Sequence, residues 1–193
     1  MIKNSWLFYL GRFLFAAAYR TVWRCSIAGH EHIPLSGGVI IAPNHCSFAD
    51  PPLVASCMRR PLFFMAKKEL FDVPIMGYLI RRTNAFPVRR GGNDIGAIRM
   101  AEQLLGEGEC LIVFPEGTRS RDGQMGPARM GVGMLACHTQ KPVVPVRIVN
   151  TLHVWSFKKI SVFFGKPLLP PAEYTKESYQ QFAEKIVDAI KKL

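Results

Sequence analysis

Short apolar runs alternate with amphipathic stretches along most of the chain. The apolar runs are bounded by glycine, proline or polar residues, which is typical of buried strands. They cover residues 38–42, 62–65, 85–88, 110–114, 143–149 and 160–164. Residues 94–105 and 174–193 instead place their apolar side chains on one stripe at helical spacing. Strands that alternate with helices predict an α/β domain, with a mixed, largely parallel sheet flanked by helices.

Capping residues and prolines refine this prediction. Asn93 or Asp94 can cap the first of these helices, and Thr175 can cap the second. Pro87 and Pro145 lack the N–H that a strand ladder uses. We therefore expect their two strands to be edge strands or to carry bulges.

Residues 1–24 precede the α/β domain, which we assign to residues 25–193. Aromatic and aliphatic side chains dominate this first segment, but Arg12, Arg20 and Arg24 interrupt it. A spanning helix needs about 20 predominantly apolar residues, and Arg12 would lie near the bilayer centre. We expect an interfacial helix, with its aromatic side chains inserted and its arginines at the lipid headgroups. The alternative is an ordinary helix of the protein core.

Charge and cysteine usage narrow the partners. The chain has 25 Lys and Arg against 14 Asp and Glu, a net charge of +11, which suits nucleic acid, an anionic membrane surface or a phosphorylated substrate. No nucleic-acid-binding motif is present, so we expect no nucleic acid partner. The five cysteines include no C-x-x-C pair, which argues against a zinc site and a disulfide framework. We expect a peripheral or monotopic protein on the cytoplasmic face of a membrane.

The first candidate for chemistry follows the strand that ends at Ala42. His45 lies in the loop after it, and Asp50 precedes Pro51, which favours the first position of a helix. His45 and Asp50 would lie on different faces of a regular helix, so they meet only if the segment turns. One interpretation is a dyad, with Asp50 fixing the tautomer and His45 acting as general base. The other makes Asp50 a plain helix cap and His45 a loop residue.

Two more loops follow predicted strands. In residues 113–120, Gly117 permits close approach of the backbone to a ligand, Thr118 offers a hydroxyl, and Arg119 can bind a phosphate through two N–H groups. A solvated turn is the alternative interpretation of that stretch. Arg89 follows another strand and precedes a glycine-rich turn and a helix, which is typical of an anion site.

Together these segments resemble the lysophosphatidate acyltransferase, or PlsC-like, branch of the glycerolipid acyltransferase family. Residues 44–50 look like its N-H-x4-D block, 86–89 like its arginine block and 143–146 like its last block. Residues 114–120 match the whole F-P-E-G-T-R-S block. The blocks occur in the family's order over about residues 38–147.

The resemblance implies acyl transfer from a thioester to the free hydroxyl of a lysophospholipid, with 1-acyl-glycerol 3-phosphate giving phosphatidate. Acyl-CoA or acyl carrier protein would be the donor, so the carrier protein is a possible partner, and neither a resident cofactor nor a metal is implied. His45 would activate the hydroxyl and then protonate the departing thiolate. Arg89, Arg119 and Lys67 would hold the acceptor's phosphate.

The remaining residues of the third block belong to the same expected substrate site. Glu116 would hydrogen-bond the acceptor or brace an arginine, beside Gly117 and Thr118. Backbone N–H groups near His45 or Gly117 are candidates for stabilising the tetrahedral oxyanion.

Three alternatives stay open at this point. The acceptor can instead be glycerol 3-phosphate, lysophosphatidylethanolamine or a lyso-ornithine lipid. A covalent intermediate on Cys46 or Cys57 would replace direct attack by the bound alcohol. A non-catalytic membrane-binding protein would need no His45 at all.

Overall fold

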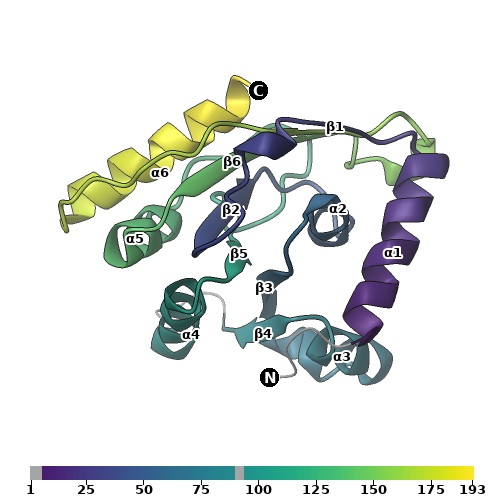
Figure 1. Ribbon diagram of the computed structural model, residues 1–193, viewed down its shortest axis with the longest axis horizontal. Coiled ribbons are helices and arrows are strands. Elements are labelled where there is room, and N and C mark those ends of the chain that lie inside the picture. Colours follow the sequence, from purple (N-terminus) through teal and green to yellow (C-terminus); the bar gives the residue numbers. More distant parts are fainter. Residues whose placement is uncertain (1–5, 90–93) are drawn as a thin grey trace.

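The computed structural model describes residues 6–89 and 94–193. Within these residues a seven-stranded sheet has the order β1-β7-β6-β2-β5-β3-β4 (Figure 1). Its neighbouring strands are parallel, except that β6 and β7 are antiparallel. The strands are β1 (Ser26–Ala28), β2 (Val39–Pro43), β3 (Leu62–Lys67), β4 (Ala85–Val88), β5 (Cys110–Ile112), β6 (Val143–Val149) and β7 (Ser161–Phe164). This confirms the predicted α/β class with a mixed, largely parallel sheet.

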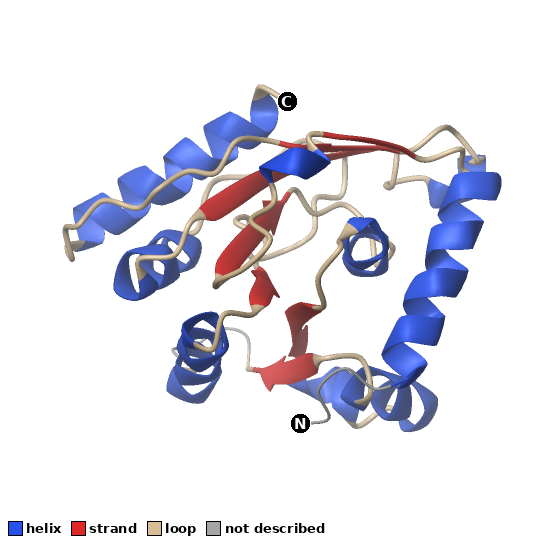
Figure 2. Ribbon diagram, viewed as in Figure 1, coloured by secondary structure: helices blue, strands red, loops and turns tan. Residues whose placement is uncertain are grey.

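Helices cover both faces of the sheet (Figure 2). Successive side chains of β2 show the division, because they point to opposite faces. Ile41 packs in one core cluster with Tyr19 and Leu53, whereas Ile40 packs in the other with Phe182. The helices are α1 (Trp6–Thr21), α2 (Asp50–Cys57), α3 (Pro74–Arg81), α4 (Ile95–Gly106), α5 (Met130–Thr139) and α6 (Lys176–Lys191). Helices α1 and α2 therefore lie on one face, and α4, α5 and α6 on the other.

The two helices predicted from periodicity have the expected caps. The Asp94 carboxylate accepts the Ala97 N–H at 3.1 Å, at the start of α4. Thr175 and Ser178 form a reciprocal capping box at the start of α6. Local side-chain chemistry therefore sets where both helices begin.

One strand and two α-helices were not predicted from the hydrophobic pattern of the sequence. The three-residue strand β1 is too short to show alternation. Helix α3 exposes its apolar side chains to solvent instead of to a core. Helix α5 is apolar on nearly every side, so it shows no stripe, and a Cβ at Gly133 would lie 1.9 Å from the Tyr179 carbonyl oxygen of α6. Glycine at that position lets α5 lie directly against α6.

The two strand prolines behave differently. Pro87 lies in β4, an edge strand, as expected. The expectation for Pro145 is wrong, because β6 lies between β7 and β2. The Val146 carbonyl accepts the Asn44 N–H on the β2 side, so the backbone of the preceding Pro145 faces the β7 side. Strand β7 ends opposite Val146. There the Pro145 carbonyl accepts the Gly165 N–H at 2.8 Å, so the missing proline N–H breaks no ladder bond.

Helix α1 has a side that packs on the domain and a side that does not. Phe8 and Tyr19 are 4% exposed, and the Arg12 guanidinium donates to the Met58 carbonyl just after α2. The expectation that Arg12 lies at lipid headgroups is therefore wrong, since it takes part in the contact with the domain. The large apolar side chains left exposed are Trp6, Tyr9, Leu10, Phe13, Leu14 and Phe15. None of the helices within residues 6–89 and 94–193 is long and apolar enough to cross a membrane.

Candidate active site

Parallel pairing brings two of the predicted loops together at one edge of the sheet. Strands β2 and β5 are neighbours, with Ile41 paired to Ile112. His45 and Glu116 each lie four residues beyond that pair, so both follow the carboxyl ends of their strands. This edge of an open α/β sheet is where ligands ordinarily bind. The loops after β2 and β5 form the candidate site.

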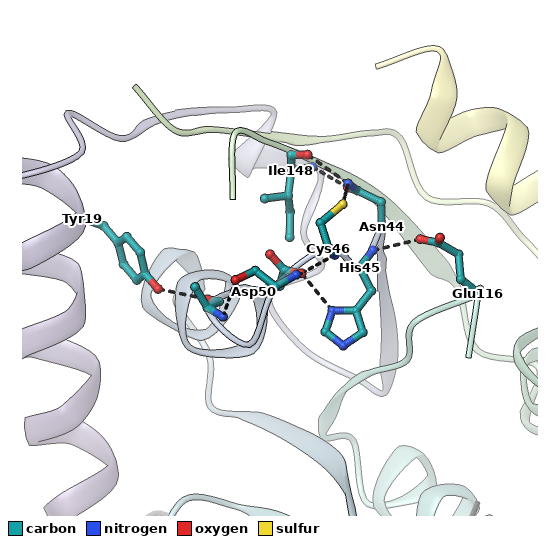
Figure 3. A network of polar contacts seen from close by, with 9 residues as sticks. Tyr19, Asn44, His45, Cys46, Asp50, Glu116 and Ile148 are labelled. Carbon is teal, nitrogen blue, oxygen red and sulfur yellow. Dashed lines mark hydrogen bonds and ion pairs between the residues drawn. The ribbon is translucent and has the colours of Figure 1, made fainter. Parts of the chain in front are cut away.

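The loop after β2 turns back so that His45 meets Asp50. His45 Nδ1 lies 2.8 Å from Asp50 Oδ2, and the N–H groups of Cys46 and Ser47 each donate to the same oxygen at 2.7 Å (Figure 3). Asp50 is completely buried. The alternative interpretation of Asp50 as a helix cap is wrong, because Ala49 is the N-cap of α2 and receives no side-chain cap bond. The carboxylate is instead committed to the histidine loop.

The two ring nitrogens of His45 are placed for different tasks. Because the Asp50 carboxylate accepts from Nδ1, the proton belongs on Nδ1, and Nε2 is left as an acceptor. Nε2 has no hydrogen-bond partner in the described part of the chain, and the side chain is 9% exposed. An almost enclosed imidazole with a free Nε2 can take a proton from a bound hydroxyl.

Two residues without a predicted role hold His45 in place. The Phe114 ring stacks on the imidazole, with centroids 3.8 Å apart and planes at 20°. The Asn44 side-chain amide donates to the Ile148 carbonyl at 3.0 Å and accepts the Ile148 N–H at 2.6 Å. Both residues belong to the resembling blocks, but their contacts form between strands and cannot be read from local spacing.

Glu116 is a brace for the backbone of the site. It is 3% exposed; Oε1 accepts the His45 N–H at 2.9 Å, and Oε2 accepts the Gly126 N–H at 2.9 Å. The His45 carbonyl in turn accepts the Ser120 N–H at 2.8 Å. Glu116 therefore orients His45 instead of bracing an arginine, and its contact with the acceptor stays a prediction.

Two of the N–H groups expected as oxyanion donors are already engaged. The His45 N–H is bonded to Glu116, and the Gly117 N–H donates to the Phe114 carbonyl at 3.0 Å. Gly117 has a φ of 68°, in the left-handed region that favours glycine. The glycine therefore serves to turn the chain out of β5 toward the exposed Thr118.

Arg119 lies at the exposed rim of the site. Its guanidinium stacks 3.6 Å above the ring of Phe48, a residue that is 70% exposed. This cation–π contact joins the loop after β5 to the loop after β2, and the Arg119 side chain is exposed there. An anion held there would lie beside the histidine loop.

Lys67 and Arg89 lie on the same edge of the sheet but farther from the dyad. Lys67 is the last residue of β3, and Arg89 directly follows β4. These strands are two and three strands from β2, or roughly 10 and 14 Å at normal strand spacing. Lys67 Nζ is 3.4 Å from Glu69. The Arg89 N–H donates to Asp94 at 2.8 Å, and this bond holds the pKa of Asp94 below its usual range. The glycine-rich turn after Arg89 falls in residues 90–93, outside the described residues, so these anion contacts stay predictions.

Tyr19 connects α1 to the dyad loop. Its hydroxyl donates to the Ala49 carbonyl at 3.0 Å, one residue before Asp50. Burial, followed by the nearby Asp50 carboxylate, raises the pKa of Tyr19. The phenol therefore stays protonated and keeps this bond at any physiological pH.

The thiols near the site are poorly suited to nucleophilic catalysis. Burial, followed by the Asp50 carboxylate, raises the pKa of Cys46. The pKa of Cys57 is raised mainly by its hydrogen bond with Cys25 and, to a smaller extent, by burial. Because the thiolate is the reactive form, both cysteines are held in the unreactive state. This favours direct attack by a bound alcohol.

Comparison with known proteins places this geometry in a family. A family model described as "Acyltransferase" matches residues 24–149, a segment that contains His45, Asp50 and Arg119. The chain belongs to the acyltransferase family. The match leaves out all of α1 and all of α6.

Several acyltransferases resemble the chain in sequence. It is 30% identical over 142 residues to the 1-acyl-sn-glycerol-3-phosphate acyltransferase of Bacillus subtilis, covering 72% of this chain and 70% of that protein. It is 30% identical over 132 residues to a chloroplast enzyme of the same name from Brassica napus. That match covers 67% of this chain but 38% of the Brassica protein, so the chain spans less than half of that relative.

A solved structure agrees with the fold. The crystal structure of the 1-acyl-sn-glycerophosphate acyltransferase PlsC from Thermotoga maritima matches with a TM-score of 0.79 and 27% identity. The match covers 96% of this chain and 77% of the Thermotoga chain. The described α/β architecture is therefore that of a PlsC-type acyltransferase.

Proposed function

We propose that the chain transfers an acyl group from a thioester to the free hydroxyl of 1-acyl-glycerol 3-phosphate, giving phosphatidate. The observation that carries the proposal is the buried His45–Asp50 pair, with the free Nε2 of His45 at the carboxyl edge of the sheet. The names of the related acyltransferases support this acceptor.

His45 acts twice in the reaction. Nε2 takes the proton of the acceptor hydroxyl while the hydroxyl oxygen attacks the thioester carbonyl carbon. When the tetrahedral intermediate collapses, the carbon–sulfur bond breaks, and the leaving thiolate takes the proton back from Nε2. Asp50 holds Nδ1 and stabilises the transient imidazolium, as the carboxylate does in hydrolase triads.

The basic rim positions the acceptor. Arg119 binds the phosphate beside the dyad, and the exposed Thr118 and Gly117 lie next to it. Lys67 and Arg89 extend the same positive edge. Holding the phosphate fixes the hydroxyl against Nε2, which lowers the entropic part of the barrier.

Helix α1 places the site at the lipid surface. Its exposed aromatic side, with Trp6 and Phe13 at 71% and 70% exposure, lies in the interface of the cytoplasmic leaflet. Arg20, exposed near its end, meets the headgroups. The acceptor then diffuses in the bilayer, and acyl-CoA or acyl carrier protein delivers the acyl chain from solution.

Thiol release tests this function directly. Purified protein in mixed micelles with palmitoyl-CoA is expected to release CoA only when 1-acyl-glycerol 3-phosphate is present, and to form phosphatidate in equal amount. Glycerol 3-phosphate, lysophosphatidylethanolamine and lyso-ornithine lipid are the comparison acceptors. Faster release with one of them would overturn the acceptor, and no release with acyl-CoA or acyl carrier protein would overturn the proposed activity.

A further inference from the structure

The segment between β6 and β7 carries the most exposed large apolar side chain of the described residues. Trp155, in the short 3-10 helix η3 (Val154–Ser156), is 83% exposed. Its indole makes no hydrogen bond or ring contact within residues 6–89 and 94–193. Phe157, two residues later, is 53% exposed. We call residues 153–159 the tryptophan loop; large exposed aromatic side chains of this kind mark a contact surface.

The charge of the tryptophan loop identifies the matching surface. Lys158 and Lys159 are exposed and directly follow the aromatic residues. No aspartate or glutamate occurs between Asp122 and Glu173. Tryptophan is favoured at the headgroup level of a bilayer, and lysines beside it are attracted to anionic lipid. The tryptophan loop therefore complements an anionic lipid surface.

Direct contacts fix this loop to the end of α1. The Trp23 indole N–H donates to the Val154 carbonyl at 2.7 Å, and the Trp23 ring stacks on Phe157 with centroids 6.0 Å apart. Phe157 has a φ of 51°, a conformation that few residues other than glycine adopt, and this stack supports it. In Figure 1 the loop lies at the C-terminal end of α1. The tryptophan loop is therefore held directly beyond the C-terminal end of α1.

The same loop borders the neighbourhood of the dyad. A cavity of about 370 Å³ is lined by Asn44 and Cys46 together with His153, Ser156 and Lys158 of the tryptophan loop. Asn44 and Cys46 flank His45 in the chain. A lipid contact at the tryptophan loop would therefore hold the His45 edge close to the bilayer.

We propose that the tryptophan loop is a second membrane contact, in which Trp155 inserts among the headgroups of an anionic bilayer and Lys158 and Lys159 bind lipid phosphates. The proposal rests on the interfacial placement of α1 in the proposed function, but it requires no catalysis. Two contacts, one along α1 and one beyond its end, fix how the domain is oriented on the membrane, which a single helix lying in the interface does not.

Vesicle binding by the full chain tests the proposal. Trp155→Ala is expected to weaken binding to vesicles of equal phosphatidylcholine and phosphatidylglycerol by about 10-fold, the order expected for losing one large buried apolar side chain. Lys158→Gln with Lys159→Gln is expected to weaken it by roughly 10-fold on these vesicles and hardly at all on pure phosphatidylcholine. Leu169→Ala is the matched control, because Leu169 is 73% exposed in the segment between β7 and α6.

Quenching by brominated lipid supplies the second measurement. Part of the tryptophan emission of the bound protein is expected to be quenched, and Trp155→Phe is expected to remove that part. Trp155→Ala with wild-type vesicle affinity, or an unquenched Trp155, would overturn the proposal. The proposal would also be overturned if Trp155→Ala lost affinity for an acidic acyl carrier protein and kept its vesicle affinity, because the loop would then bind a protein.

Activity in detergent micelles separates this proposal from the proposed function. Trp155→Ala is expected to keep wild-type thiol release there, because the micelle supplies the acceptor without a membrane to dock on. Retained release together with lost vesicle binding supports the second contact alone. If the wild-type protein releases no thiol, but Trp155→Ala still weakens its vesicle binding, the proposed enzymatic function is overturned and the second membrane contact is supported.

Discussion

Around His45 the side chains are buried and hydrogen-bonded. Along one side of α1 and in the tryptophan loop, by contrast, large apolar side chains are exposed to solvent. Asp50, Glu116 and Asn44 are at most 3% exposed, and the side chain of each takes part in at least two hydrogen bonds. Trp6, Phe13 and Trp155 are at least 70% exposed. A proton must be transferred at a fixed geometry, so the first region is preorganised. The proposed bilayer contacts instead need exposed apolar surface, and the second region provides it.

Tyr19 and Trp23 are the points where these two regions meet. Tyr19 donates from α1 to the residue before Asp50, and Trp23 holds the tryptophan loop. The substitutions that follow break one region at a time and so sharpen the contrast between them.

Asp50→Asn removes the charge from the preorganised region without changing its shape. The three donors converge on Oδ2, while Oδ1 is buried without a partner among the described residues, so an amide nitrogen at Oδ1 displaces no bond. We expect turnover to fall by about 100- to 1,000-fold, because the imidazolium loses its counter-charge. Steady-state kinetics and a thermal melt check this; a variant with near wild-type turnover would remove Asp50 from the mechanism.

Glu116→Gln separates a brace from a substrate ligand. A glutamine keeps one acceptor but turns an NH₂ toward one of two backbone N–H groups, those of His45 and Gly126. An unsatisfied buried pair costs about 1–3 kcal/mol of stability. We expect turnover to fall by roughly 10- to 100-fold with the Michaelis constant for the acceptor unchanged. A raised Michaelis constant at normal turnover would instead make Glu116 a substrate ligand.

Arg119→Ala tests the rim, where the preorganised region opens to solvent. Removing a phosphate contact of this exposed arginine is expected to raise the Michaelis constant for 1-acyl-glycerol 3-phosphate by about 10-fold, and Arg119→Lys to restore part of it. Arg121→Ala, an exposed neighbour, is the control. If Arg119→Ala leaves both the Michaelis constant and turnover unchanged, Arg119 does not hold the phosphate.

Two phenylalanines of α1 give the smallest and most selective effects. Phe13 is 70% exposed. We expect Phe13→Ala to weaken vesicle binding by several-fold and to leave the melting temperature unchanged. Phe8 is 4% exposed. We expect Phe8→Ala to lower the free energy of unfolding by about 3–5 kcal/mol, as for a phenylalanine of the core. Cosedimentation and thermal melts measure the pair. Equal effects of both variants on stability would mean that α1 is an ordinary core helix.

The contrast also explains what the sequence could predict. The dyad loop could be predicted because His45 and Asp50 follow a strand and precede a helix-starting proline, all within one local stretch. The sheet could be predicted because buried strands are continuous apolar runs. Helix α5 could not, because a helix that is apolar on nearly every side has no stripe.

The parts that escaped prediction depend on distant contacts. Asn44 acquires its role from Ile148, more than a hundred residues away, and Glu116 from the His45 backbone across two strands. The sequence places Arg12 at the headgroups, but its partner is the Met58 carbonyl, which only the packing of α1 against the domain supplies. Trp155 stands among other aromatic residues in the sequence, and its exposure becomes visible only in the fold.

Turnover of His45→Ala beside His138→Ala tests the central claim most directly. His138 lies on α5, across the sheet, and serves as the matched histidine control. With palmitoyl-CoA and 1-acyl-glycerol 3-phosphate in mixed micelles, we expect His45→Ala to lose acceptor-dependent thiol release by about 1,000-fold or more, and His138→Ala to retain it. Retention of more than about a tenth of the wild-type rate by a folded His45→Ala protein would contradict the general-base role of His45.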